Sequence, residues 1–238
     1  DAVPKGELAY PSGETPTIAS LQTAVVTGTR STPDTNVYTD NGQTPPLGRV
    51  KARFHWDRDQ GHLHENSSCW LRVMQGMSGD GFGVDFLPRV GQEVVVAFEN
   101  GNPDRPFILG ALYNDRNQPP YRNEPTQSGI RTRSFDSNSP DERNELRFDD
   151  KAGSEEIYVH AQKNLKLDVL NNEERNIGNN LVTVINEDEI RDVGRQLDVT
   201  AGDTIMLSVG NNQIKIDKGG ITIQGGAITI NGKPVKIN

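Results

Sequence analysis

The feature that most constrains the fold of this 238-residue chain is a short hydrophobic period in its last third. Small or branched apolar residues recur every eight positions, at Val169, Ile177, Ile185, Val193, Ala201 and Val209, and a glycine directly follows four of them. After Gly210 the step becomes seven, in the series Ile214, Ile221, Ile228, Val235 and the series Ile216, Ile223, Ile230, Ile237. The two series together give pairs of residues two positions apart, such as Ile214 and Ile216. The two side chains of each pair lie on one face of a short strand. A repeat this short indicates a fibrous or solenoid unit that cannot bury its apolar stripe alone.

Three architectures could bury this stripe. A single-chain parallel β-helix needs several repeats per coil, and its calcium-binding version needs an Asp that Lys218–Ile223 does not supply. A β-meander normally closes its core with large aromatics, and no aromatic residue follows Tyr158. Three identical chains wound about one axis need only thin aliphatic stripes that meet in the middle. The pattern favours this intertwined trimer over a monomeric solenoid, with the predicted axis residues Ile177, Ile185, Val193, Val209, Ile216, Ile223 and Ile230.

The preceding part of the chain has a different composition and predicts a small β-barrel. Thirteen of the fourteen prolines lie at or before Pro140. Five short runs rich in β-branched or aromatic residues are bounded by Gly, Asn, Asp or Pro, at Leu21–Thr27, Arg49–Trp56, Cys69–Gln75, Gln92–Glu99 and Pro106–Leu112. In the second run, Val50, Ala52, Phe54 and Trp56 alternate with polar residues, so we expect all four on the inward face.

These patterns divide the chain into four predicted segments. Residues 1–16 are rich in Pro and Gly and are expected to be a tether from an upstream domain. Residues 17–115 form the predicted barrel, residues 116–145 are a polar, proline-rich connector, and residues 146–238 hold the short-period repeat, which the family resemblance given below implies is a needle. The predicted fold class is therefore all-β, with a barrel followed by strands that intertwine in a trimer.

Charge and composition exclude several functions. The net charge is −8, with −7 before residue 161, so the chain offers no long-range attraction for nucleic acid or anionic lipid. The longest apolar run, Val94–Phe98, is far shorter than the roughly 20 residues of a membrane-spanning helix. Cys69 is the only cysteine, which rules out an intrachain disulfide or a thiol cluster.

Two groups of residues could carry chemistry, and for both the structural interpretation is the stronger. His62 and His64, near His55 and Cys69, have zinc-ligand types but lie in a polar loop. The doublets Asp149-Asp150 and Glu155-Glu156 could serve a glycosidase, yet adjacent strand residues point to opposite faces, so neither doublet pairs two carboxylates by itself. The glycine-rich stretch Gly79–Gly83 lacks the Lys-Ser/Thr of a phosphate loop and is predicted to be a turn. We expect no catalytic residue, metal or cofactor.

Several stretches of the chain resemble the VgrG spike proteins of bacterial type VI secretion systems. The resemblance extends over roughly residues 17–210. The stretches that carry it are Pro46–Lys51, Phe54–Arg58, Glu65–Val73, Gly79–Phe86, Pro88–Val96, Gly101–Pro106, Tyr113-Asn114, Ser128–Ser134 and Asn144–His160. The resemblance implies an oligonucleotide/oligosaccharide-binding (OB) fold barrel followed by a triple-stranded β-helix, similar to the cell-puncturing spike of contractile-tailed phages. It also implies an obligate homotrimer and a hub domain before Asp1.

What the resemblance implies for function is a non-enzymatic, membrane-puncturing needle, present in the bacterial cytoplasm before firing and then secreted with effector proteins. Its expected partners are the secretion tube and a PAAR-repeat tip protein, with only transient passage through membranes and no nucleic acid. The tip protein is expected to dock on Lys233, Val235, Lys236, Ile237 and Asn238. The alternatives are a phage or pyocin tail spike that binds a surface receptor, or one that degrades the cell wall.

Overall fold

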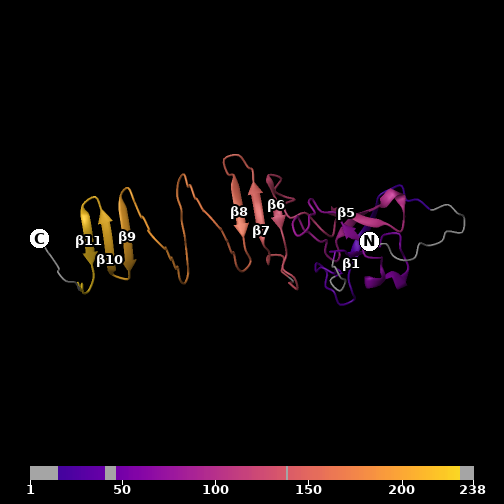
Figure 1. The fold of residues 1–238 in the computed structure, drawn as a ribbon, viewed down its shortest axis with the longest axis horizontal. Helices are drawn as coiled ribbons and strands as arrows, with labels where there is room; N and C mark the ends of the chain where they lie inside the picture. The colour runs from indigo at the N-terminus through magenta and orange to yellow at the C-terminus, as the bar shows by residue number, and fades with distance from the viewer. Residues whose placement is uncertain (1–15, 41–46, 138, 231–238) are drawn as a thin grey trace. The chain divides into compact units, whose positions relative to one another are not determined.

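The computed structural model describes residues 16–40, 47–137 and 139–230, and it divides the chain into two compact units, up to Asp168 and from Val169 onward (Figure 1). Every element of regular structure in the described residues is a strand or a 3-10 turn, so the all-β prediction is confirmed. The 3-10 turns are η1 (Gln60–His62), η2 (His64–Asn66) and η3 (Glu99–Gly101).

The first unit begins with a five-stranded sheet in the order β2-β1-β4-β5-β3. Its strands are β1 (Gln22–Thr27), β2 (Lys51–Phe54), β3 (Arg72–Val73), β4 (Glu93–Phe98) and β5 (Pro106–Leu112). All neighbours are antiparallel except β3 and β5, which run parallel. An isolated bridge between Val50 and Leu71, with backbone hydrogen bonds of 3.0 and 2.8 Å, joins the β2 edge to the β3 edge. The sheet therefore closes into the predicted barrel.

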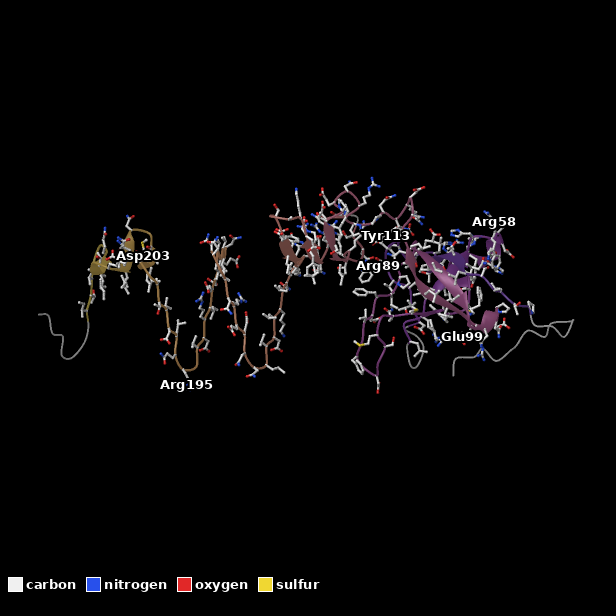
Figure 2. All side chains as sticks on the ribbon, turned by 90° about the horizontal axis from the view of Figure 1, so that it is seen from above. Arg58, Arg89, Glu99, Tyr113, Arg195 and Asp203 are labelled. Carbon is white, nitrogen blue, oxygen red and sulfur yellow. The ribbon has the colours of Figure 1, made fainter. Side chains whose placement is uncertain are left out.

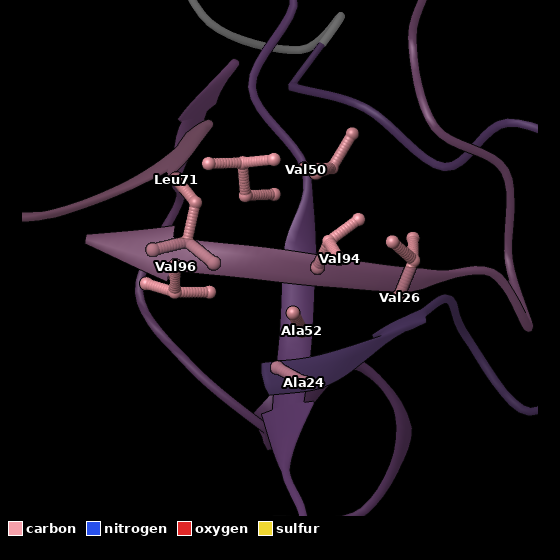
Figure 3. Close-up of a cluster of buried hydrophobic side chains, with 8 residues drawn as sticks. Ala24, Val26, Val50, Ala52, Leu71, Val94 and Val96 are labelled. Carbon is pink, nitrogen blue, oxygen red and sulfur yellow. The ribbon is translucent and has the colours of Figure 1, made fainter. Parts of the chain in front are cut away.

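The barrel core follows from the strict alternation of its strands. Residues two apart point to the same face of a strand, so the inward positions of the short strands converge. Eight small or branched side chains fill the centre (Figure 3), namely Ala24, Val26, Val50, Ala52, Leu71, Val94, Val96 and Ile108. At the edge, the buried Asp40 accepts hydrogen bonds from Arg49 Nε at 2.6 Å and Arg49 N at 3.0 Å, which fastens the chain entering β2.

One inward position of the barrel was predicted wrongly. Trp56 lies outside β2 and its surface is 63% exposed. The strand ends at Phe54 because the Asp57 N–H turns back to donate to the Phe54 carbonyl at 3.1 Å. The Trp56 ring stacks on Phe54, with ring centroids 5.2 Å apart, and does not enter the core.

A second sheet follows in the same unit, with β6 (Gln127–Arg131), β7 (Glu145–Asp149) and β8 (Glu156–His160) as an antiparallel meander. Strand β6 lies inside the segment predicted to be a connector, and it pairs with β7 from Gln127–Asp149 to Arg131–Glu145. The strands after the barrel therefore begin before residue 146.

The second unit contains β9 (Thr204–Val209), β10 (Asn212–Asp217) and β11 (Gly220–Gln224), again an antiparallel meander. Within one chain these strands thus adopt the meander pairing that the sequence did not favour. The glycine turns place Gly210 and Gly220 at positive φ, 55° and 131°, where a residue with a side chain would be strained.

Candidate functional site

The β9–β11 sheet has one apolar face and one polar face. Residues paired across antiparallel strands point to the same side. The register aligns Leu207, Ile214 and Ile223 in one row and Ile205, Ile216 and Ile221 in the next. The opposite face carries Met206, Lys215 and Thr222 in one row and Ser208, Gln213 and Gln224 in another.

The apolar face of this sheet is uncovered. Ile214 and Ile216 are 42% and 43% exposed on the central strand, and Ile221 on the edge strand is 71% exposed. A half-buried antiparallel sheet normally turns its apolar face to a core, so this face requires a partner surface. Three of the predicted axis residues, Val209, Ile216 and Ile223, lie on it.

The β6–β8 sheet in the first unit repeats the arrangement. Ile130, Leu146 and Val159 form one row, and Phe148 pairs with Ile157 in the next. All five side chains are exposed, from 38% for Leu146 to 68% for Ile157. Both units therefore present an apolar sheet face that the chain itself does not cover.

Between these sheets, residues 169–203 contain no assigned strand but keep the eight-residue period in their exposure. Val169, Ile177, Ile185 and Val193 are all 43–48% exposed, whereas other aliphatics of the segment, such as Val182, Val184 and Ile190, are 80–89% exposed. The periodic residues thus share one environment along the segment. Their role as axis residues stays a prediction.

The polar face of the β6–β8 sheet is organised around a buried carboxylate, Glu145. Its Oε2 accepts from Arg143 Nε at 2.6 Å, and its Oε1 accepts from the Arg131 guanidinium and the Tyr121 hydroxyl, each at 3.0 Å. Burial by itself would raise the pKa of Glu145, but these donors outweigh it and lower the pKa to about 2. Arg147 links the cluster to Glu156 at 2.7 Å and lies over the Tyr158 ring.

This Glu145 cluster was missed by sequence reasoning. The available signal was the alternation of Glu145, Arg147 and Asp149 with Leu146 and Phe148, which separates a polar face from an apolar one. It gives no hint that Tyr121 and Arg131 meet Glu145. The cluster holds the polar face in place and leaves the opposite, apolar face free for assembly.

Comparison with known proteins identifies both parts of the chain. The family model for the type VI secretion system/phage-baseplate injector OB domain matches residues 36–113, and that for the bacteriophage T4 gp5 C-terminal trimerisation domain matches residues 128–227. The chain is 41% identical over 177 residues to the type VI secretion system spike protein VgrG1c of Pseudomonas aeruginosa. The chain belongs to the VgrG spike family.

Two other VgrG relatives show the same pattern of coverage. VgrG1a of Pseudomonas aeruginosa is 43% identical over 156 residues, which is 65% of the chain. The actin cross-linking toxin VgrG1 of Vibrio cholerae is 47% identical over 118 residues, which is 49% of the chain and 10% of the toxin. The VgrG1c match covers 74% of the chain, and the chain spans 23% of the length of VgrG1c and of VgrG1a. The two family matches, together with the all-β structure, give the fold as an OB-fold barrel followed by a β-helix needle.

Two candidate carboxylates of this VgrG chain, Asp149 and Glu156, accept hydrogen bonds from side-chain donors. Asp149 and Glu156 face each other across β7 and β8, a pairing that neither sequence doublet implies. Asp149 accepts from Gln127 Nε2 at 2.9 Å and from Thr126 Oγ1 at 2.8 Å, and these bonds lower its pKa. A glycosidase acid requires a raised pKa, so Asp149 does not fit that role.

Two histidines of the VgrG barrel, His55 and His62, are placed by local contacts. His62 Nδ1 lies 3.0 Å from Asp57 Oδ2, and His55 Nε2 lies 3.5 Å from Glu93 Oε1. Within the described ranges, no three His, Cys, Asp or Glu side chains form a group that could hold a metal ion. The same residues include no helix with the length and hydrophobicity to cross a membrane.

Two predicted segments lie outside the described residues. They are residues 1–15 of the tether predicted at 1–16, and the tip residues Lys233, Val235, Lys236, Ile237 and Asn238.

Proposed function

We propose that this chain is the barrel and shaft of a puncturing spike, in which three copies join their apolar stripes along a common axis. The observation that carries the proposal is the uncovered apolar face on the β6–β8 and β9–β11 sheets. The trimerisation-domain match over residues 128–227 supports three copies as the number that covers it. The predicted axis residues, from Ile177 to Ile230, form the core of this trimer.

The energetics suit a rigid needle. Fully burying a Val, Leu or Ile side chain is worth roughly 1.5–3 kcal/mol, and side chains that are already about half covered gain about half of that. A stripe of such residues repeated along three chains sums to a large assembly energy, and no chain can leave without exposing the stripes of two partners. The opposite, polar sheet face, with Lys215, Thr222 and Gln224, lies on the outside of the shaft and is solvated by water.

The spike acts mechanically and outside the cell that makes it. Its relatives are type VI secretion spikes, which supports secretion. A stage in the bacterial cytoplasm before firing is part of the proposal. The match to the actin cross-linking toxin covers 10% of that protein and transfers no enzymatic activity to this chain. We propose that the tip residues Lys233–Asn238 dock a PAAR-repeat protein, and that the secretion tube and effectors are the other partners.

Sedimentation of the purified chain tests the assembly. The expected mass is three times the 26.2 kDa of one chain. A folded monomer at micromolar concentration would refute the trimeric shaft. Deleting Lys233–Asn238 is expected to abolish capture of the tip protein in a pull-down while the trimer persists, and unchanged capture would place the docking site elsewhere.

A further inference from the structure

An ordered hairpin with exposed apolar side chains projects from the barrel between β3 and β4, and we name it the 74–86 hairpin. Its base is clamped by Gln75, whose amide exchanges two hydrogen bonds with the backbone of Phe86, at 3.1 and 3.2 Å. Its stem is paired by the Val84 N–H to the Met77 carbonyl at 3.0 Å. The tip turn closes through the Gly79 N–H and the Phe82 carbonyl at 2.8 Å. These contacts fix the hairpin backbone.

The hairpin displays apolar residues that the barrel core does not use. The exposed fractions are 59% for Met74, 53% for Met77, 67% for Phe82, 40% for Val84 and 56% for Phe86. A concentration of exposed Met and Phe on a fixed backbone is typical of an interaction element, because ordering it on binding costs little entropy.

A groove of about 730 Å³ lies beside the base of the hairpin, and we name it the 110 groove after Gly110. Its apolar lining includes Met74, Phe86, Tyr113 and Ile130. A side chain added at Gly110 would meet nothing within 4 Å, so this part of the wall is open. Arg89 and Tyr113, both lining residues, are labelled in Figure 2.

The groove also carries positive charge. Three arginines, Arg89, Arg131 and Arg133, line it against one carboxylate, Asp85. Arg89 donates to the carbonyl oxygens of Thr35 and Arg133. Burial, together with the neighbouring Arg133 charge, lowers the pKa of Arg89. The tip of the 74–86 hairpin, in contrast, carries the exposed carboxylate of Asp80 beside Phe82. Hairpin tip and groove are complementary in both charge and apolar character.

We propose that the Phe82 tip of one copy inserts into the 110 groove of the next copy, so that the three barrels interlock around the axis. The inference rests on the trimer of the proposed function. The occupant is a second copy because Ile130 belongs both to the groove and to the apolar face of β6–β8, which makes the two surfaces continuous. Met74 and Phe86, at the base of the hairpin, line the groove of their own chain, whereas the tip residues Asp80 and Phe82 do not. A head-to-tail contact forms a closed ring only when its rotation closes, and the three-fold axis of the proposed trimer supplies that rotation.

Site-directed cross-linking tests the contact in the full chain. In a Cys69→Ser background, the pair Ser78→Cys and Gly110→Cys is treated with a short bis-maleimide, which leaves Phe82 and Asp80 intact. The expected product is covalent dimer and trimer on a denaturing gel. The matched control pairs Ser78→Cys with Arg58→Cys, an exposed position outside the groove, and is expected to stay monomeric. Adding Phe82→Ala to the first pair should lower the yield on the order of tenfold.

Sedimentation of the same variants separates the two hypotheses. If the variant sediments as a trimer but the Ser78→Cys, Gly110→Cys pair gives only monomer bands on the gel, the interlocking contact is refuted. The trimeric shaft would then still stand, and the groove would bind another partner. Equal yields from the Gly110 and Arg58 pairs overturn it as well, because the linking would then be nonspecific. A folded monomer refutes the proposed trimer, and the interlocking contact with it.

Discussion

Glu145 is the residue whose replacement tests the β6–β8 sheet most directly. Its side chain is fully buried and accepts hydrogen bonds from Arg131, Arg143 and Tyr121. The substitution Glu145→Gln keeps the shape and removes the charge, leaving the arginines without their counter-ion. The folded structure lowers the pKa of Glu145 from 4.5 to about 2. At 1.36 kcal/mol per pKa unit, the ionised carboxylate contributes about 3 kcal/mol per chain to the free energy of unfolding.

The sign of the pH dependence follows from the lowered pKa. The contribution is complete above pH 4.5, the ordinary value of the carboxyl, and is lost as the pH falls through about 2. Wild type should therefore lose about 3 kcal/mol more stability than Glu145→Gln between pH 6 and pH 2. At pH 7 the variant should already be less stable by a similar amount.

Denaturant unfolding of both proteins, followed by circular dichroism at equal protomer concentration, measures these differences. Hydrogen exchange of the β7 amides localises the loss to this sheet. The control is Glu142→Gln, an exposed carboxylate three residues away that should change stability by less than about 0.5 kcal/mol. If Glu145→Gln matches Glu142→Gln at pH 7, or follows the wild-type pH slope, the cluster does not stabilise the sheet.

Three further predictions address the barrel, the shaft and the absence of catalysis. Asp40→Asn should destabilise the barrel by about 2–4 kcal/mol, because it leaves the buried Arg49 contact unpaired, and thermal unfolding followed by tryptophan fluorescence would reveal it. Ile216→Asp should convert the trimer to monomer or aggregate in sedimentation, whereas the adjacent Lys215→Asp, on the polar face, should leave the trimer assembled. Amide replacements at Asp149 and Glu156 should leave secretion intact in a type VI secretion assay, and peptidoglycan turnover by wild type that these replacements abolish would contradict a non-enzymatic spike.

Local patterns in the sequence were enough to predict most of the barrel strands and the apolar face of the last sheet. Runs rich in β-branched or aromatic residues and bounded by Gly, Asn, Asp or Pro placed β1, β4 and β5 to within about one residue at each end, because such residues fit a half-buried strand. The eight- and seven-residue steps likewise put Val209, Ile216 and Ile223 on one side, and the structure shows that shared face. The prediction that Trp56 points into the barrel was wrong, because the hydrogen bond from the Asp57 N–H to the Phe54 carbonyl ends the strand before Trp56.

Only the tertiary structure decided the features that join distant segments. Strand β6 is polar and contains Gly129, so its sequence has no strand pattern, and it exists because β7 supplies the hydrogen-bond ladder. The Glu145 cluster draws Tyr121 and Arg131 from before β7, and the 110 groove joins Met74 to Ile130. Such contacts depend on where the folded chain returns to itself, and sequence spacing carries no information about that return, whereas strand alternation is fixed by the geometry of neighbouring residues.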